Sequence, residues 1–461
     1  MKLTVLGGGG ARIPALVYAV VGDRATTFDR IDLFEPDPQR RASLGRLSME
    51  LAAALGHEDT VGVTADVEEA LSGADYVFSA VRVGGDAGRI IDEEVALARG
   101  IVGQETTGPG GCAMALRTIP VVLGYCDVIA KVAPGATLVN FTNPAGIITQ
   151  AITEHSPVRA VGVCDTPSQT VARIAEFLGA DPGQVTFSYG GLNHLGWISS
   201  VVVDGHERIE ELVANYGALR AFSHRFAFDA DLVRRLGCIP TEYLYYFYDS
   251  AEYLKGVAHA GTTRGNDVRR FNEALIGRVN RAFATGDVHE AWAAYSEVLS
   301  ARRASNMRLD FGGERADPEA RSGSDADPLD GRSRKIGGYE GVALRVIDGL
   351  SGAEPARVVV NTRNGPTLDF LGTDDVVEVP ALVDSQGVAP LANAGLSGAS
   401  RGLVLQVKEY EQAVVEAAVT ADAGLAALAL AMHPLVPGLG AAKELMSAYR
   451  EAHSPYLDYL R

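Results

Sequence analysis

The sequence predicts an α/β protein in which a doubly wound parallel sheet is followed by an α+β domain. From residue 2 to about 148, short β-branched runs alternate with stretches of helical periodicity, which is typical of βαβ units. Beyond about residue 167 the pattern changes to long Ala-rich helices mixed with polar strands. Because 461 residues are also many for one core, we expect two domains, at residues 1–167 and 168–461.

The individual elements follow from the same alternation. Helical periods cover residues 13–21, 38–55 and 116–132, and a long uncharged stretch at 423–442, interrupted by His and Pro, is expected to be a buried helix and its exit. The polar run at 306–334 is expected to be a mobile surface loop, with a lid as the alternative. The expected strands are KLTVLG, RIDLFE, TVGVTA, ADYVFSAVRV, TLVNFTN and RAVGVC in the first domain, then GWISSVVVDG and ARVVVNT in the second.

Composition excludes some classes of partner. The formal net charge of −17 argues against nucleic acid or an anionic membrane, because phosphate-rich surfaces need a basic face. An anionic small substrate would need a local basic pocket. The first apolar run is too short for a signal peptide, so we expect a cytoplasmic protein. Its four widely spaced cysteines favour free thiols over disulfides: Cys112, Cys126, Cys164 and Cys238.

A glycine run closes the first expected strand and opens the first expected helix. It comprises Gly7, Gly8, Gly9 and Gly10, and glycines there let the backbone approach a pyrophosphate at the helix N-terminus. The strict GxGxxG spacing is not met, since Arg12 stands at the third glycine position. Glu35 closes the second strand, where an acidic residue binds ribose hydroxyls. The alternative is a tight turn without a ligand.

Cys164 and His194 indicate a possible metal site. Cys164 follows the strand RAVGVC at its carboxyl end, where parallel sheets place their ligands. His194 lies in GLNHLGW, where Asn193 and two glycines predict an irregular polar loop. One thiolate and one imidazole, completed by oxygens of substrate and water, suit a loosely held divalent transition ion. A small buried core cysteine is the alternative reading.

Other polar residues are candidates for substrate binding or catalysis, and each also has a purely structural alternative. Asn143 ends TLVNFTN and either recognises sugar hydroxyls or caps a helix. Glu105 stands alone in a Gly-rich turn, and Tyr243 belongs to a tyrosine cluster that is either core or the source of a general base. Arg89 and Arg264 are anion contacts or surface charges.

Taken together, these residues and motifs resemble glycoside hydrolase family 4, an NAD-dependent exception to the two-carboxylate glycosidases. The resemblance implies a Rossmann-like first domain, a second domain of the lactate/malate dehydrogenase C-terminal type, and NAD and Mn²⁺ (or another divalent metal) as cofactors. It also implies oxidation of the sugar at C3, deprotonation at C2, elimination of the aglycone and addition of water. The matching segments, in order along the chain, are the glycine run with Glu35, GIVGQETTGPGG, ALRTIP, VNFTNPAG, GVCDTP, GLNHLGW, PTEYLYYF, TRGNDV, VVNTRNG and DDVVEVPALV.

The resemblance also implies roles for individual residues. Tyr243 is the base at C2 with Glu105 raising its basicity, and Asp165 matches the general acid of α-specific members. Cys164 and His194 are the metal ligands. Arg264 meets the sugar 6-phosphate, which a positive group must bind in so acidic a chain. Substrate contacts are Arg89, Asn143 and Asn193, and cofactor contacts are Gly7, Gly8, Gly9, Gly10, Ala11, Arg12, Glu35 and Val81.

The expected substrate is a phosphorylated disaccharide or glucoside, and the expected state is a homodimer or homotetramer. QETTGPGG and ALRTIP resemble the 6-phospho-β-glucosidases, whereas Asp165 stands where many β-specific relatives carry Asn. We therefore predict a 6-phospho-β-glucosidase, with 6-phospho-α-glucosidase as the alternative. A lactate/malate-type dehydrogenase and a non-catalytic sugar-phosphate sensor are further alternatives, and neither accounts for Cys164, His194 and Tyr243 together.

Overall fold

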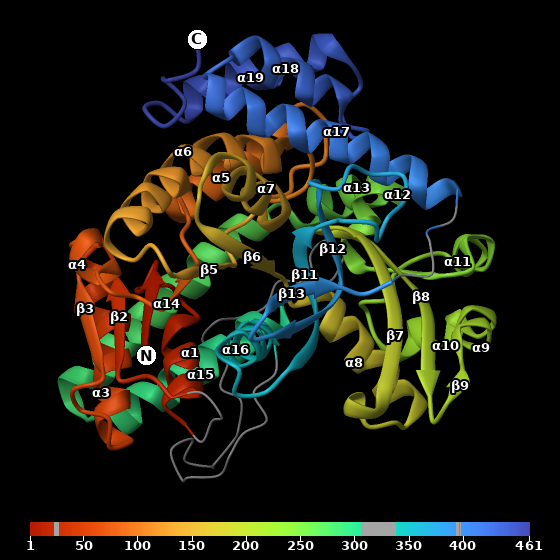
Figure 1. The fold of residues 1–461 in the computed structure, drawn as a ribbon. Coiled ribbons are helices and arrows are strands. Elements are labelled where there is room, and N and C mark those ends of the chain that lie inside the picture. Colours follow the sequence, from red (N-terminus) through yellow and green to blue (C-terminus); the bar gives the residue numbers. More distant parts are fainter. Residues whose placement is uncertain (23–26, 306–337, 393–395, 397) are drawn as a thin grey trace.

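One mixed sheet organises the fold (Figure 1). The computed structural model describes residues 1–22, 27–305, 338–392, 396 and 398–461, so the predicted loop at 306–334 lies outside the described residues. Within them the sheet has 13 strands in the order β10-β8-β7-β12-β11-β6-β5-β4-β1-β2-β3, with β13 on β12 and β9 on β8. The strands are β1 (Lys2–Leu6), β2 (Arg30–Phe34), β3 (Val61–Thr64), β4 (Tyr76–Ser79), β5 (Thr137–Asn140), β6 (Arg159–Val163), β7 (Val185–Leu192), β8 (Leu195–Val203), β9 (His206–Glu207), β10 (Ile239–Pro240), β11 (Ala356–Arg363), β12 (Val376–Asp384) and β13 (Gly387–Pro390).

The first six strands are the parallel part of this sheet. They pair in the order β3-β2-β1-β4-β5-β6, and each coincides with one of the apolar runs expected from the sequence. The strand order reverses between β1 and β4, which is the position where doubly wound sheets bind their ligands. The predicted α/β class with a Rossmann-like parallel sheet is therefore confirmed.

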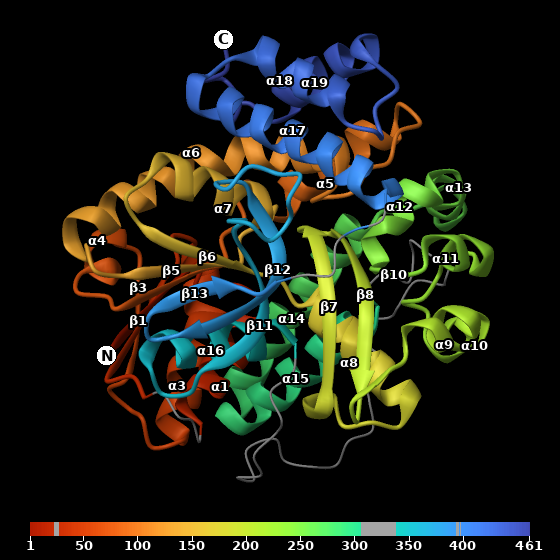
Figure 2. The ribbon, with the colours of Figure 1, turned by 45° about the vertical axis from the view of Figure 1, so that its right-hand side comes forward.

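The remaining strands extend the same sheet in antiparallel pairing. β11 joins the edge of β6, β12 follows β11, and the β7–β8 hairpin lies beyond β12 (Figure 2). Both expected domains therefore contribute to one continuous sheet. The boundary at residue 167 stays a prediction.

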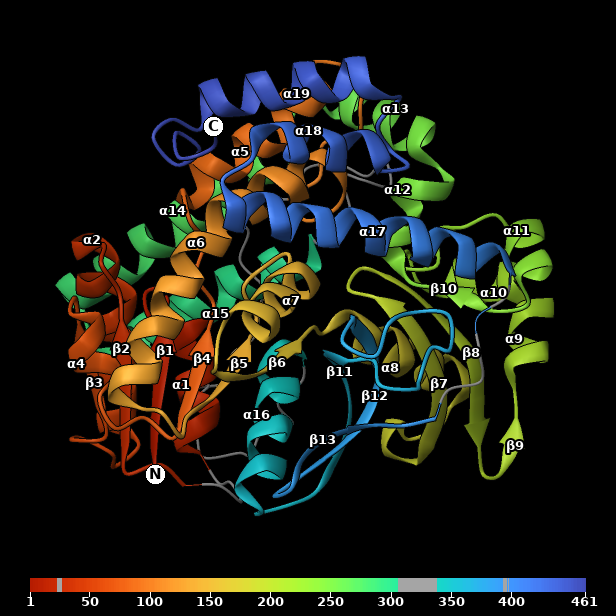
Figure 3. The same cartoon turned by 45° about the horizontal axis from the view of Figure 1, so that its top comes forward.

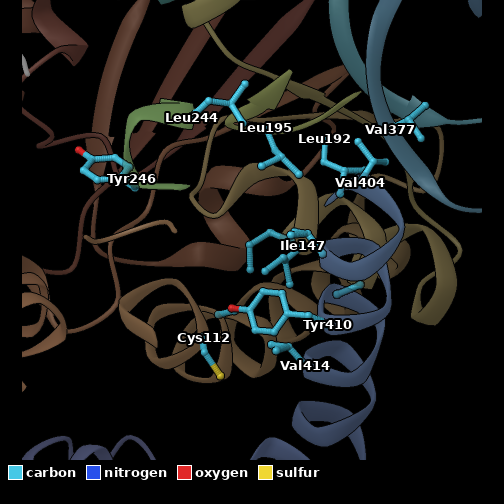
Figure 4. Close-up of a cluster of buried hydrophobic side chains, with 14 of the residues drawn as sticks. Cys112, Ile147, Leu192, Leu195, Leu244, Tyr246, Val377, Val404, Tyr410 and Val414 are labelled. Carbon is cyan, nitrogen blue, oxygen red and sulfur yellow. The ribbon is translucent and has the colours of Figure 1, made fainter. Parts of the chain in front are cut away.

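Helices cover both faces of the sheet. Apolar side chains of α1 and α16 pack on one face, and those of α6, α7 and α17 pack on the other, with α17–α19 outermost (Figures 1, 3 and 4). The helices are α1 (Ile13–Val21), α2 (Pro38–Arg40), α3 (Arg46–Ala54), α4 (Val67–Leu71), α5 (Gly85–Leu97), α6 (Gly108–Val132), α7 (Ala145–His155), α8 (Thr166–Leu178), α9 (Ile209–Ala214), α10 (Tyr216–Phe222), α11 (Ala230–Leu236), α12 (Tyr245–Tyr248), α13 (Ser250–Ala260), α14 (Arg264–Thr285), α15 (Val288–Ala304), α16 (Gly338–Ser351), α17 (Gly398–Thr420), α18 (Ala423–Met432) and α19 (Leu439–Ala452), with short turns η1 (Arg41–Gly45), η2 (Pro182–Gln184) and η3 (Glu242–Leu244).

Helix α6 differs from its prediction in where it begins. It starts at Gly108, not at residue 116, because Gly110 and Gly111 allow the preceding loop to lie against it. A Cβ at these positions would stand 2.2 Å from the carbonyl oxygen of Gln104 and 2.4 Å from that of Thr106. By length and composition α6 could cross a membrane, but most of its apolar residues are buried against neighbouring core helices.

Candidate active site

A cavity of about 430 Å³ opens at the carboxyl ends of the parallel strands, beside the point of strand reversal. It brings together most of the residues singled out in the sequence. Those that line it are Gly10, Ala11, Arg12, Val81, Arg89, Glu105, Asn143, Cys164, Asp165, His194, Tyr243 and Arg264, whereas Gly7, Gly8, Gly9, Glu35 and Asn193 are not among its lining residues.

The glycine run forms the turn between β1 and α1. Gly7 has a positive φ of 87°, and a Cβ there would lie 2.7 Å from the carbonyl oxygen of Ala80. This close approach to the end of β4 requires glycine. The following residues, from Gly10 to Ile13, face the cavity at the N-terminus of α1, where backbone N–H groups favour an anion.

Glu35 supports this turn in the structure. Its Oε2 accepts a hydrogen bond from the Gly9 N–H at 3.0 Å, and its Oε1 accepts one from the Asp37 N–H at 3.0 Å. The carboxylate is buried and lies beneath the turn, outside the cavity lining. Its predicted contact with ribose therefore stays a prediction.

Glu105 is carried by the loop that precedes α6. Arg89 Nη1 donates to Glu105 Oε1 at 2.7 Å, and Arg82 pairs with the other oxygen. Burial alone would raise the pKa of Glu105, but these two guanidinium groups lower it to about 2. Glu105 is therefore a carboxylate at any physiological pH. Arg89 also donates to Glu93 at 2.9 Å, so two acids hold its side chain in the cavity wall.

Cys164 and Asp165 lie where β6 passes into α8. Cys164 is 6% exposed, and burial, followed by the charges of Glu378 and Asp165, raises the pKa of its thiol well above the usual value. A thiolate at this position thus requires a cation beside it. The Asp165 carboxylate accepts from Gln169 and lies 3.7 Å from Arg12 Nη1, which links it to the glycine turn.

His194 sits in a tight hairpin turn, not in the irregular loop expected from the sequence. Asn193 and His194 connect β7 to β8, and the flanking Leu192 and Leu195 are buried in the apolar cluster of Figure 4. His194 has a φ of 62°, which places its backbone in the left-handed region. The turn directs His194 into the cavity, whereas the Asn193 amide donates to Glu378 on β12 at 2.9 Å.

The hydrogen bonds around His194 define its tautomer. Gln104 Oε1 accepts from the N–H groups of Thr106 and Thr107, both at 2.7 Å, and from the Thr106 hydroxyl at 2.9 Å. Since the single hydroxyl proton is used, Thr106 Oγ1 accepts from His194 Nδ1 at 2.7 Å. Burial lowers the pKa of His194 to about 4, so the ring is neutral and Nε2 keeps its lone pair.

This donor set fits a weakly bound divalent ion. A neutral imidazole with a free Nε2 and a neighbouring buried thiol are suitable ligands for a transition metal. Among the described residues there is no group of three or more His, Cys, Asp or Glu side chains able to hold an ion. Oxygens of a bound substrate would therefore have to complete the coordination.

Thr106→Val is expected to weaken binding of a divalent ion about 10–100-fold, which is typical for loss of a hydrogen-bond partner that orients a ligating histidine. The variant keeps the shape of the side chain but frees His194 to adopt the other tautomer. Titration with Mn²⁺ followed by electron paramagnetic resonance measures the effect. Thr107→Val is the control, because only the backbone of Thr107 takes part in this network; equal ion affinity in the Thr106 variant would contradict the tautomer assignment.

Tyr243 lies in η3, directly over His194. The two rings stack with centroids 3.6 Å apart and an interplanar angle of 5°. Burial, then the acidic groups Glu242, Cys164, Glu105 and Asp165, raise the pKa of Tyr243 well above its usual value. The phenol thus keeps its proton in this arrangement, and a cation at the neighbouring ligands would favour its release.

Arginines at one end of the cavity were only partly anticipated from the sequence. Arg264 Nη1 donates to Ser305 Oγ at 2.7 Å and Nη2 donates to the carbonyl oxygen of Arg302 at 3.3 Å, so Arg264 braces the end of α15. Arg302 itself lines the cavity. Its pKa is lowered to about 9, first by burial and then by Arg12, Arg264 and Arg82, with a small opposing contribution from Asp86. No sequence pattern marked Arg302, because only tertiary packing brings these guanidinium groups together.

Comparisons with known proteins agree with the fold. Residues 2–180 match the model described as "Family 4 glycosyl hydrolase", and residues 189–436 match its "C-terminal domain". A "Probable 6-phospho-beta-glucosidase" of Bacillus subtilis is 29% identical over 99% of this chain and 97% of the relative. The "6-phospho-beta-glucosidase BglT" of Thermotoga maritima is 29% identical over 99% of both chains.

Solved structures extend the comparison to the whole fold. The T. maritima 6-phospho-beta-glucosidase with manganese, NAD⁺ and glucose-6-phosphate superposes with a TM-score of 0.80 at 27% identity, covering 99% of both chains. A 6-phospho-alpha-glucosidase from gut microorganisms, in complex with NAD and glucose-6-phosphate, has a TM-score of 0.78 at 25% identity and covers 99% of this chain and 98% of that one. With both family models matched in order along the sequence, this chain belongs to glycosyl hydrolase family 4.

Proposed function

We propose that this protein hydrolyses 6-phospho-glucosides, with β-linked substrates preferred, and that it uses NAD⁺ and a divalent ion such as Mn²⁺. Relatives named 6-phospho-β-glucosidase match along the full length, and one of them has been solved with manganese, NAD⁺ and glucose-6-phosphate. A cytoplasmic location and a homodimeric or homotetrameric state are part of the same proposal. α-Linked substrates are the second candidate, because a maltose-6'-phosphate glucosidase is 27% identical over all of this chain and because Asp165 is present.

The arginine cluster is the observation that supports a phosphorylated substrate. Four guanidinium groups, of Arg12, Arg82, Arg264 and Arg302, interact at one end of a partly buried cavity. Arg82 and Arg12 already face Glu105 and Asp165, whereas burial and the neighbouring guanidinium groups disfavour the charge of Arg302, which a bound anion would stabilise. A phosphomonoester dianion matches the charge and the planar donor geometry of arginine.

Each of the remaining cavity residues has a separate proposed role in the reaction of the sugar. NAD⁺ and the ion, when bound, would supply hydride acceptance at C3 and polarisation of the sugar oxygens. Tyr243 would take the C2 proton, with the negative charge of Glu105 nearby. Asp165 would donate a proton to the departing oxygen, and Cys164 with His194 would hold the ion. Gly10 to Arg12, at the start of α1, would bind the dinucleotide.

An assay of p-nitrophenyl α- and β-glucosides, each with and without a 6-phosphate, tests this function in the presence of NAD⁺, Mn²⁺ and a reductant. Release of nitrophenol from the β-linked phosphate with no build-up of NADH is the expected result. Stoichiometric NADH formation would indicate a dehydrogenase instead. Binding of glucose-6-phosphate without cleavage of any glycoside would indicate a sensor.

Arg302→Gln is expected to lower kcat/KM for the phosphorylated glucoside about 10–150-fold, since a hydrogen bond to a charged group contributes about 1.5–3 kcal/mol. Affinity for NAD⁺, measured by fluorescence titration, should stay within twofold. Arg269→Gln is the control, because Arg269 is an exposed arginine of α14 outside the cavity. If the Arg302 variant lost NAD⁺ affinity instead, the cluster would belong to the cofactor's pyrophosphate.

A further inference from the structure

Glu378 is a buried carboxylate that the proposed chemistry does not use. It lies in β12, is 1% exposed, and accepts three hydrogen bonds. Tyr189 Oη donates to Oε2 at 2.5 Å, and the amides of Asn193 and Asn361 donate to Oε1 at 2.9 and 3.2 Å. Burial raises the pKa of Glu378 to about 7, and the three hydrogen bonds oppose that rise. A buried acid requires such partners, and each of the three comes from a strand or turn close to the candidate ion ligands.

The sheet register places Glu378 between the two strands that deliver these ligands. Gly162 of β6 pairs with Asn361 of β11, Asn361 pairs with Glu378, and Glu378 pairs with Gly191 of β7. This row of four residues runs straight across the sheet. One end lies two residues before Cys164 and the other lies three residues before His194, so the row spans the distance between the two ligands.

The bond from Asn193 connects Glu378 to the conformation of His194. Asn193 and His194 are the two residues of the hairpin turn, and His194 adopts a left-handed backbone that a non-glycine residue rarely takes. Fixing the Asn193 side chain to Glu378, which does not line the cavity, restrains the turn that carries His194.

We propose that Glu378 is a positioning residue for the divalent ion: through Asn193 it fixes the turn that carries His194, and through Asn361 it joins that turn to the strand that ends at Cys164. The inference rests on the proposed function, because it takes Cys164 and His194 as the ion ligands. It also assigns Asn193 to this support, in place of the substrate contact predicted from its motif.

Glu378→Met tests the proposal, since it keeps the approximate length of the side chain but removes Oε1, the oxygen that accepts from both Asn193 and Asn361. The Kd for Mn²⁺, measured by electron paramagnetic resonance on the NAD⁺-saturated full-length protein, should rise about 10–100-fold. The Kd for NAD⁺ should change less than twofold. A change in Mn²⁺ affinity alone indicates positioning of the ion ligands. A general loss of structure would weaken the binding of Mn²⁺ and of NAD⁺.

Asn193→Ala, and a double variant changed at both Glu378 and Asn193, complete a double-mutant cycle. If Glu378 acts through Asn193, Asn193→Ala alone should raise the Kd for Mn²⁺ to a similar degree, and the double variant should add little to either. Should Glu378→Met fail to fold, Asn193→Ala alone decides the question. Tyr189→Phe is the matched control, because it removes the bond to Oε2 and leaves the Asn193 bond in place, and a Kd within threefold of the parent is expected.

The outcomes distinguish this inference from the proposed function. An unchanged Kd for Mn²⁺ in both Glu378→Met and Asn193→Ala, with a parent protein that binds Mn²⁺, would overturn the positioning role alone. A parent protein that binds no Mn²⁺ in the presence of NAD⁺ would overturn the proposed function and the inference together. A double variant whose loss of Mn²⁺ affinity equals the sum of the two single losses would also contradict action through Asn193.

Discussion

Tyr243→Phe is expected to reduce kcat about 10²–10⁴-fold, the usual consequence of removing a general base. The ring that stacks on His194 is retained, and the neighbouring Leu244 remains buried, so the fold and the binding of NAD⁺ and Mn²⁺ should persist. Only the oxygen that would take the C2 proton is lost. Nitrophenol release from the 6-phospho-β-glucoside measures the effect on turnover.

The same variant separates elimination from direct displacement. Elimination breaks the C2–H bond, so the parent enzyme in D₂O should give product with deuterium at C2, detected by NMR, and the variant should not. Tyr248→Phe is a suitable control, because Tyr248 lies in the next turn of the chain and does not line the cavity. Product from the parent without deuterium at C2, or parental turnover by the Tyr243 variant, would contradict the proposed role.

Cys164→Ser and His194→Ala are each expected to abolish Mn²⁺-dependent hydrolysis. Since the described residues hold no group of three His, Cys, Asp or Glu ligands, the loss of either donor leaves one of the two candidate ligands, to which a transition ion binds weakly. NAD⁺ binding should be retained, since the glycine turn is formed by other strands. Ion titration and hydrolysis measured together check both statements.

A second cysteine provides the control for this experiment. Cys238→Ser changes another buried thiol that does not line the cavity, and it should keep its ion affinity. Hydrolysis at the parental rate by Cys164→Ser after treatment with a chelator would show that the ion is bound elsewhere.

Local sequence signals predicted the parallel half of the fold well. Each of the first six strands is a short β-branched run, and burial on both faces of a parallel sheet requires that composition. The start of α6 was not predictable in this way. Gly110 and Gly111 reduce helix propensity, and the loop contact that makes them necessary is visible only once residues 104–106 are placed.

In the candidate site, too, residues in local motifs were predictable from the sequence, and residues brought in by tertiary packing were not. Cys164, His194 and Tyr243 stand in distinctive motifs, and the structure brings all three to one cavity. Asn193 was expected to contact the substrate because of the family resemblance, and that contact stays a prediction. However, successive residues of a tight turn direct their side chains differently, and its amide bonds to Glu378. Arg302 carries no local signal at all, since its importance arises from helices that meet only in the folded protein.

The position of β11 and β12 has a consequence for synthesis of the chain. These strands separate β6 from β7 in the sheet, although they are translated long after both. At 5–20 residues per second, roughly 8–30 s pass between residue 194 and residue 356 leaving the ribosome's catalytic centre. During that interval the nascent chain exposes two unpaired sheet edges, which are prone to pairing with other chains. Both edges stay open to such pairing until the last strands of the sheet emerge and fill the gap between β6 and β7.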